Sequence, residues 1–464
     1  MSDRLQAEQW FADPRVADAR RMILAGLAEH QRSLTGVRPP AAERKVAYDE
    51  LLKQFGQQRA GNLFFPYLGS GFGSGPLVEL ADGSVKFDFI SGIGVHHFGH
   101  GNPALVSACL DAALRDTVMQ GNLQQNLESA SLSELLLRGA QPDSRLAHCF
   151  LTSSGAMANE NALKLAFHQR PGTTRILAFE HAFAGRTTAL ACITDNAAYR
   201  VGVPAVLNVD YVPFFDAARP AESMERSLAV LRAHLARFPD QHAAIWCELV
   251  QGEGGFNAGT REFFTAVFEL VQKHKIAIVA DEVQTFGRTS RLFAFQHFGL
   301  EHFVDIVTTG KMLQVCATLF TDAMKPGPGL LSQTFTASTS AILAAETILK
   351  DLLKPELFGE TGRNMQVHAH LVRRIEALGK AHPGWVRGPY GLGGMFAFTP
   401  FDGTEEKVKK ILHALFANGV IAFYNGGNPT RLRFLPPVPA LTDGHMDAVC
   451  DILDATMTQV AATF

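Results

Sequence analysis

Two side chains that could do chemistry together follow neighbouring apolar runs of the sequence. Asp281 ends the run IAIVA, and Lys311 ends the next run, VDIVTTG, thirty residues later. If both runs are parallel strands joined by a loop and a short helix, their carboxyl ends bring the carboxylate and the amine into one crevice. A lysine in such a site can have a lowered pKa and act as nucleophile and base. The ordinary alternatives stay open, with Asp281 as a loop cap and Lys311 as a surface residue.

A third candidate feature is the segment Ser153-Ser154-Gly155-Ala156, which lies between an apolar run and the helical pattern AMANENALKLAFHQ. Amide groups at a helix N-terminus bind phosphate through their hydrogens and the helix dipole. Ser154 could instead be a plain N-cap. Pyridoxal phosphate (PLP) needs a Schiff-base lysine, a carboxylate that keeps the pyridine nitrogen protonated, and donors for the phosphate. The three features together predict a PLP site with Lys311 as the Schiff-base residue.

Two other glycine patterns fail as nucleotide sites. The stretch Gly71-Phe-Gly-Ser-Gly75 has the spacing of a dinucleotide loop, but a hairpin pattern follows it where a helix is required. Gly310-Lys311 has the ending of a phosphate loop, but Asp305 and Met312 stand where that motif requires Gly and Ser or Thr.

The elements that would position the candidate residues lie between about residue 100 and residue 345. Short apolar runs alternate there with longer helical stretches, which predicts an α/β domain with a mostly parallel sheet buried on both faces. We expect strands at 147–153, 175–180, 243–250, 276–283 and 304–310, and helices at 156–169, 223–237, 261–274 and 338–353.

The flanking regions have different patterns. Two alternating runs joined by Asp82-Gly83 predict a β-hairpin, after a glycine-rich stretch that we interpret as turns. The C-terminal region mixes helices with short strands, which favours a smaller α+β domain. The predicted parts are an N-terminal helical segment (1–60), a hairpin that belongs to the small domain (61–99), the large PLP-binding domain (100–345) and the C-terminal small domain (346–464).

Composition excludes several classes of protein. The 464 residues include 42 basic and 45 acidic ones, without a basic stripe, so nucleic acid is not an expected partner. No apolar run is long enough to span a bilayer, and the N-terminus lacks a signal core. The six cysteines form no Cys-x-x-Cys pair, so we expect neither a zinc site nor disulfides, and a cytoplasmic location.

Seven segments in order resemble the class III aminotransferases of PLP fold type I, the group that contains ornithine, acetylornithine and lysine 6-aminotransferases. The resemblance covers roughly residues 62–440. Each segment is weak alone, but the ordered set is specific. The segments are FDFISGIGVHHFGHGNPALV (87–106), SSGAMANENALKLA (153–166), HAFAGRT (181–187), ELVQGEGG (248–255), ADEVQTFGR (280–288), DIVTTGK (305–311) and LRFLPP (432–437).

The resemblance implies a role for each matching residue. Phe183 would stack on the cofactor ring and Gln284 would hydrogen-bond its phenolic oxygen. Gly155 and Ala156, beside Ser154, would bind the phosphate through backbone amides. Thr334 matches a threonine that the family lends to the phosphate of the neighbouring subunit, which implies a homodimer with shared active sites.

Three more matches concern the substrate. By resemblance, Arg186 binds the distal carboxylate of 2-oxoglutarate and Arg433 holds an α-carboxylate, since the planar guanidinium grips carboxylates bidentately. Glu253 matches the glutamate that pairs with that arginine when the amino donor brings no carboxylate there. The implied reaction moves the terminal amino group of an ω-amino acid or diamine to a 2-oxo acid, 2-oxoglutarate, by a ping-pong mechanism.

The sequence departs from the family pattern at four places, which leaves the amino donor open. A glycine is missing between Thr285 and Phe286, Ala184 replaces His or Trp, TAST follows Phe335, and Met312 follows the lysine. The stretch KMLQVC resembles lysine 6-aminotransferases more than ornithine-type enzymes. A PLP racemase or aminomutase on the same fold, or an inactive protein of this fold that serves as a binding partner, are the alternatives.

Overall fold

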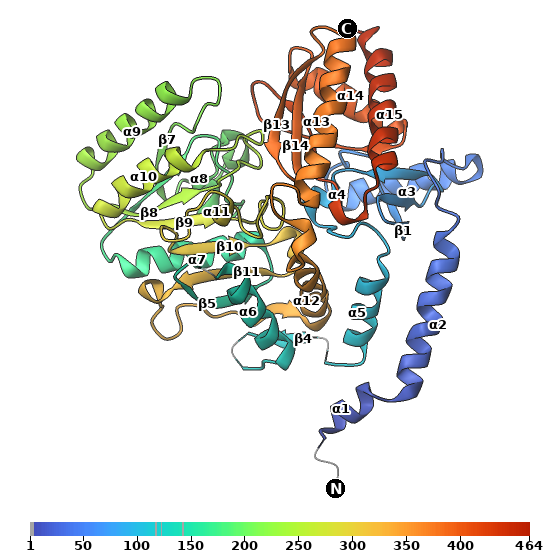
Figure 1. Cartoon of the computed structure of the whole chain (residues 1–464), viewed down its shortest axis with the longest axis horizontal. Helices are drawn as coiled ribbons and strands as arrows, with labels where there is room; N and C mark the ends of the chain where they lie inside the picture. Colours follow the sequence, from blue (N-terminus) through green and yellow to red (C-terminus); the bar gives the residue numbers. More distant parts are fainter. Residues whose placement is uncertain (1–3, 117, 122, 142) are drawn as a thin grey trace.

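A seven-stranded sheet forms the centre of the computed structural model, which describes residues 4–464 except 117, 122 and 142 (Figure 1). Its strands are β5 (Leu146–Thr152), β6 (Arg175–Phe179), β7 (Asn208–Val212), β8 (His242–Cys247), β9 (Ala277–Asp281), β10 (Ile306–Thr309) and β11 (Cys316–Thr321). The spatial order is β5-β11-β10-β9-β8-β6-β7. β11 runs antiparallel to both β10 and β5, and the other four pairs are parallel. The predicted α/β fold with a mostly parallel sheet is confirmed, and all five predicted strands are present.

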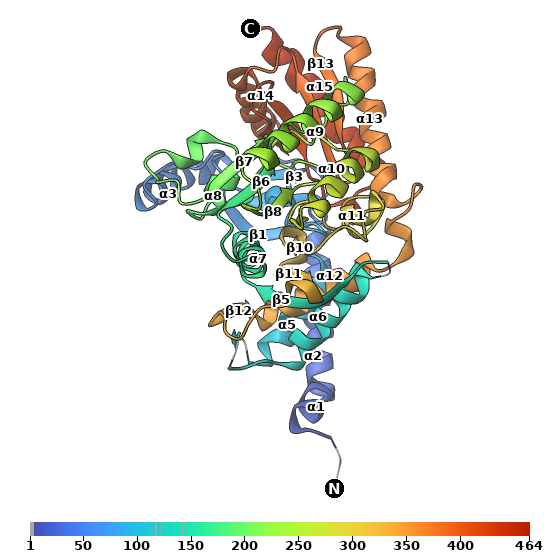
Figure 2. The same ribbon diagram turned by 90° about the vertical axis from the view of Figure 1, so that its left-hand side faces the viewer.

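Helices cover both faces of this sheet, as the apolar strands require (Figure 2). They include α7 (Gly155–Gln169), α9 (Pro220–Arg237) and α10 (Arg261–Lys273). The order of the strands places α7 on one face and α9 and α10 on the other, because crossover connections between parallel strands are right-handed. Successive turns of α10 bury Phe264 and Phe268, so the predicted helices lie where the apolar periodicity places them.

A separate four-stranded antiparallel sheet lies in the C-terminal region, at the top of Figure 1. The elements there are α13 (Arg363–Ala381), β13 (Val386–Leu392), β14 (Met395–Pro400), α14 (Glu405–Ala417), β15 (Val420–Ile421), β16 (Phe423–Asn425), β17 (Arg431–Phe434) and α15 (Asp443–Ala461). The sheet has the order β13-β14-β17-β16. The predicted mixture of helices and short strands is confirmed, and we propose residues 346–464 as the core of a small domain.

A third sheet pairs three strands from the N-terminal part of the chain with one short strand from the C-terminal part. It contains β1 (Gly69–Ser74), β2 (Leu77–Leu80) and β3 (Val85–Asp88) in the order β1-β2-β3-β15. The predicted hairpin is confirmed as β2 and β3. The interpretation of the preceding glycines as turns is wrong, because they form β1. A Cβ at Gly73 would lie 2.6 Å from the carbonyl oxygen of Leu77 and 2.4 Å from His100, so glycine here permits close strand approach.

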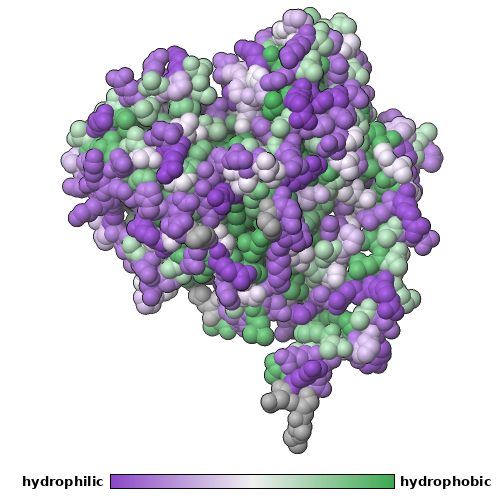
Figure 3. Space-filling view, in the orientation of Figure 1, coloured by the Kyte–Doolittle hydropathy of each residue, from purple (hydrophilic) through white to green (hydrophobic). Residues whose placement is uncertain are grey.

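Residues 4–60 form helices, as predicted: α1 (Gln6–Phe11), α2 (Pro14–Gln31) and α3 (Lys45–Gln58). Figure 3 shows hydrophobic side chains along this arm as well as near the middle of the same face. Met22 and Val46 are among the exposed apolar residues.

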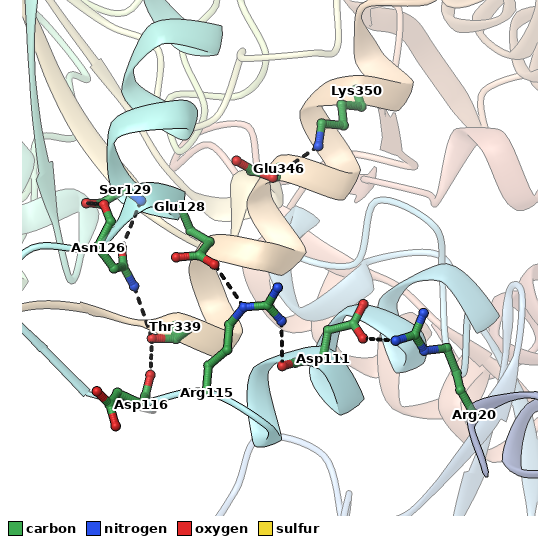
Figure 4. A network of polar contacts seen from close by, with 10 residues as sticks. All are labelled: Arg20, Asp111, Arg115, Asp116, Asn126, Glu128, Ser129, Thr339, Glu346 and Lys350. Atoms are coloured by element: carbon green, nitrogen blue, oxygen red, sulfur yellow. Dashed lines mark hydrogen bonds and ion pairs between the residues drawn. The ribbon is translucent and has the colours of Figure 1, made fainter. Parts of the chain in front are cut away.

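Polar contacts tie the arm to the body of the protein (Figure 4). Arg20 of the arm forms an ion pair with Asp111. Arg115 then bonds both the Asp111 carbonyl at 2.8 Å and the Glu128 carboxylate at 2.9 Å. Other elements of this region are α5 (Pro103–Ala113), β4 (Val118–Gln120), α6 (Leu127–Ala140), β12 (Phe335–Ser338) and α12 (Thr339–Leu352). These contacts join α2 to α5 and to the start of α6.

Candidate active site

The candidate residues from five of the predicted segments gather at one edge of the central sheet. Residues 153–156 follow β5, Phe183 follows β6, Glu253 follows β8, Asp281 ends β9 and Lys311 follows β10. All five strands point the same way, because only β11 and its two neighbours are antiparallel pairs. Their carboxyl ends therefore form the crevice in which open α/β sheets bind ligands.

The predicted proximity of Asp281 and Lys311 is confirmed by the pairing of their strands. Thr308 on β10 lies opposite Asp281 on β9, three residues before the lysine. Lys311 begins the 3₁₀ turn η3 (Lys311–Leu313) with φ of 47°, a conformation that non-glycine residues rarely adopt. Burial lowers the pKa of Lys311 to about 8, while Glu253, Glu248 and Asp281 oppose this shift. The amine is thus partly neutral near physiological pH.

Asp281 is held by donors alone. Asn159 donates to its Oδ2 at 2.7 Å, the indole of Trp246 donates to the same oxygen at 3.4 Å, and the Val283 amide donates to Oδ1 at 3.0 Å. Burial raises the pKa of Asp281, and these hydrogen bonds and the charge of Lys311 act against it. The set favours a carboxylate that faces a cation. Sequence analysis missed Asn159 and Trp246, although Asn159 lies inside the SSGAMANENALKLA segment.

The predicted phosphate cradle is the N-terminus of α7. Ser154 is the N-cap, and its hydroxyl accepts from the Met157 amide at 3.2 Å. The Gly155 and Ala156 amides belong to the first turn, where no intrahelical acceptor exists. A Cβ at Gly155 would lie 2.8 Å from Val283. Glycine thus lets the helix end approach the loop that follows Asp281.

Glu253 and Arg433, the two residues predicted to meet the substrate, form an ion pair of 2.9 Å, with Arg433 entirely buried on β17. Arg433 also donates to the Gly252 carbonyl at 3.2 Å. Burial acts to raise the pKa of Glu253, but the charges of Arg433 and Lys311 outweigh it and lower the pKa. Gln284 hydrogen-bonds the same carboxylate. The ion pair therefore lies close enough to Lys311 for their charges to interact, and it joins the loop after β8 to β17 of the C-terminal sheet.

Glu248 is a buried carboxylate that the sequence analysis included in a motif but did not assign. Its two oxygens accept from the amides of Phe183 and Gly252, both at 2.9 Å. Burial raises the pKa of Glu248 to about 8, and the charge of Asp281 adds to this effect. Through these two hydrogen bonds, Glu248 connects the backbone at Phe183 to the loop that carries Glu253.

Two of the predicted site residues, Arg186 and Thr334, lie at the exposed margin of the site. Arg186 is exposed, and its guanidinium carbon lies over the Tyr199 ring, 4.1 Å from the ring centroid. Thr334 is also exposed and lies before β12, where its carbonyl accepts from the Gly121 amide at 3.1 Å. In the contacts of the described residues, Thr334 touches none of the other candidates within its own chain.

The departures from the family pattern occupy defined places in the fold. Met312 is buried, and a Cβ at Gly287 would lie 2.6 Å from its sulfur, so the shortened loop after Asp281 packs directly on the residue after the lysine. Ala184 is buried and its carbonyl accepts from Asn159 at 2.6 Å. Part of the TAST stretch forms β12, and Ser338 caps α12.

The residues present fit PLP by an observation independent of motifs. Gln284 Oε1 and Thr309 Oγ1 are buried polar atoms without a hydrogen-bond partner among the described residues. Thr309 lies two residues before Lys311, and Gln284 lies in the loop that follows Asp281. Buried polar atoms in native proteins are nearly always satisfied, so such atoms in a crevice indicate groups that meet a ligand. A protonated ring nitrogen would in turn satisfy the charge of Asp281.

The comparisons with known proteins decide the family. The model of class III aminotransferases matches residues 70–457. The chain is a class III aminotransferase. An acetylornithine aminotransferase of Methanocaldococcus jannaschii is 31% identical over 408 residues, covering 84% of this chain and 93% of the relative. One of Bacillus subtilis is 31% identical over 390 residues, covering 82% and 93%.

Solved structures show the same fold for this aminotransferase. A lysine aminotransferase of M. tuberculosis superposes with a TM-score of 0.79 at 24% identity, covering 89% of this chain and 99% of that one. An ornithine aminotransferase of Toxoplasma gondii gives 0.75 at 20% identity, covering 91% and 100%. The enzyme is therefore a PLP-dependent transaminase of fold type I. The racemase, aminomutase and inactive alternatives are not favoured.

The lowered pKa of Lys311 predicts a distinct reactivity of its amine in the cofactor-free aminotransferase. Only a neutral amine attacks an acylating reagent, so labelling of Lys311 should rise with pH and level off above about 8. The internal reference is Lys354, whose pKa is raised by its hydrogen bond to Asp351. Competitive acetylation followed by mass spectrometry measures both. Equal midpoints for the two lysines would contradict the prediction.

Proposed function

We propose that this aminotransferase moves the terminal amino group of an ω-amino acid or diamine to 2-oxoglutarate. The supporting observation is the 2.9 Å ion pair between Glu253 and the fully buried Arg433 next to Lys311. An acceptor with two carboxylates would use Arg433 for one and Arg186 for the other. A donor without a carboxylate at its reacting end would leave Arg433 paired with Glu253.

The names of the relatives support this donor class. Acetylornithine, lysine and ornithine, which appear in the names of the similar proteins, all carry an amino group at the end of a chain. Lysine, ornithine, acetylornithine, a diamine and 4-aminobutyrate remain the candidate donors for this enzyme. The mechanism is ping-pong, because PLP, when bound, carries the amino group from the donor to the acceptor.

We assign the cofactor contacts as follows. Lys311 would hold the cofactor and carry protons on its amine, and Asp281 would keep the ring nitrogen protonated. The other proposed contacts are Phe183 to the ring, Gln284 to the phenolic oxygen, and Ser154, Gly155 and Ala156 to the phosphate. The exposure of Thr334 supports its place at the phosphate of a neighbouring subunit in a homodimer.

All six cysteines are free, which supports the cytoplasm as the compartment. Within the described residues, every helix is too short or too polar to cross a bilayer.

The half-reactions test the proposed substrates. Arg186→Ala should slow the reaction with 2-oxoglutarate roughly 10- to 100-fold, the value of a charge-assisted hydrogen bond, and leave the donor reaction nearly unchanged. Glu253→Ala should instead favour α-amino acids such as glutamate over ω-amino donors, because Arg433 stays open. Stopped-flow absorbance of the cofactor measures each half.

Arg219→Ala is the control for Arg186, since Arg219 is an exposed arginine that pairs with Asp216. If Arg186→Ala slows both half-reactions equally, or if the wild type does not convert 2-oxoglutarate to glutamate, the proposed acceptor is wrong.

A further inference from the structure

The side chain of Arg186 has one defined partner, an aromatic ring. Its guanidinium carbon lies 4.1 Å from the ring centroid of Tyr199. In the part of the chain that the structure describes, no carboxylate lies within ion-pair distance of Arg186. The Tyr199 ring stands edge-on to Phe183, with centroids 6.2 Å apart and planes at 89°. Arg186, Tyr199 and Phe183 thus form a continuous row from the rim of the crevice to its wall.

Tyr199 sits on a fixed support. It belongs to the 3₁₀ turn η2 (Ala197–Arg200), which Asn196 caps by accepting from the Ala198 amide at 3.0 Å. The Arg200 guanidinium donates to the Ala191 carbonyl at 3.0 Å and the Thr194 carbonyl at 2.6 Å. These bonds attach the turn to the buried helix α8 (Leu190–Ile193). The ring is therefore held by the fold, whereas the long Arg186 side chain on its own is not.

We propose that Tyr199 is a positioning residue that holds Arg186 ready for the distal carboxylate of a dicarboxylic acceptor. A guanidinium can in general make both contacts at once. Stacking uses the face of the guanidinium plane, whereas its N–H donors point outward within that plane toward a carboxylate. The ring thus orients the guanidinium without occupying the N–H donors that would bind the carboxylate. The inference rests on the proposed role of Arg186 and extends it to a residue outside the motif.

The consequence is a selective effect on one class of ligand. Losing the ring should weaken binding of a dicarboxylate about 3- to 10-fold, the usual size of a cation–π contact at a partly exposed site. A monocarboxylate of similar length does not reach Arg186 with a second charge, so its binding should not change. A purely structural role for Tyr199 would weaken both ligands and reduce cofactor uptake.

The experiment compares Tyr199→Leu with Tyr199→Phe in the cofactor-loaded enzyme. Calorimetric titration with glutarate and with butyrate gives the two affinities without turnover, and KM and kcat for 2-oxoglutarate give the kinetic counterpart. We expect Tyr199→Leu to weaken glutarate binding and raise KM with little change in kcat, and Tyr199→Phe to restore both. Phe238→Leu is the matched control, because it removes another arginine stack, that of Arg175 at 3.7 Å, outside the crevice.

A double-mutant cycle separates the possible failures. If Tyr199 acts through Arg186, Tyr199→Leu should add no further loss of glutarate affinity in the Arg186→Ala background. An additive loss, or an unchanged affinity of Tyr199→Leu while Arg186→Ala weakens binding, overturns the inference and leaves the proposed function intact. An unchanged affinity of Arg186→Ala overturns the acceptor assignment and this inference together.

Discussion

Lys311→Ala is expected to lower turnover by about 10³-fold or more, since general acid–base catalysis alone contributes about 10²–10⁴-fold. The structure gives the reason. Burial lowers the pKa of this amine to about 8, and Asp281 lies opposite Thr308, three residues before it. No other lysine follows a sheet strand at this edge in the described chain. Single-turnover kinetics of the purified variant measures the loss.

Two controls make the Lys311 assignment specific. Lys354→Ala removes an exposed lysine that pairs with Asp351 and should leave turnover unchanged. Borohydride treatment of the wild type should fix the cofactor on the peptide that contains Lys311. Cofactor recovered on another lysine, or substantial turnover in the alanine variant, would show that Lys311 does not hold it.

Asp281→Asn is expected to reduce turnover about 10²–10³-fold, the typical cost of removing one electrostatic contact to the reacting system. A neutral amide cannot keep the ring nitrogen protonated, so electron withdrawal by the cofactor is lost. The new amide would also point a donor at Asn159 or Val283, both of which donate to Asp281 in the wild type. Steady-state kinetics and the absorbance of the bound cofactor measure the two effects.

Asp305→Asn provides the comparison for Asp281. Asp305 lies at the opposite end of the sheet, where it accepts from the Ile278 amide at 2.9 Å and from Arg145 at 3.0 Å. Its loss should lower the melting temperature and leave kcat near the wild-type value. A near-normal kcat for Asp281→Asn would instead show that another group faces the ring nitrogen.

The sequence predicted the positions of Asp281 and Lys311 because parallel strands leave a long apolar signature. Once β9 and β10 are neighbours, the ends of both strands must share an edge, and their register follows from the fold. The predicted runs did not include β11, which runs antiparallel between β5 and β10. Whether a strand runs parallel or antiparallel to its neighbours depends on the connections between strands, and a short apolar run contains no information about this orientation.

Other residues were beyond prediction because their roles are set by distant partners. Glu248 accepts hydrogen bonds from the amides of Phe183 and Gly252, which lie in loops after two different strands. Tyr199 becomes notable only when folding brings it over Arg186. The strand at Gly69–Ser74 was missed because glycine propensity indicates turns, whereas here the close approach of Leu77 and His100 demands glycine.

The pairing of β3 with β15 has a consequence for how the protein is made on the ribosome. Val420 and Ile421 complete a sheet whose other strands end at Asp88, and Lys86 donates to the Phe416 carbonyl across 330 residues. At about 5–20 residues per second, synthesis of this interval lasts on the order of tens of seconds. Throughout that time β3 lacks the strand that pairs with its edge in the folded protein. An unpaired strand edge can associate with other chains. The sheet can therefore reach its final pairing only after Val420 and Ile421 have been synthesised.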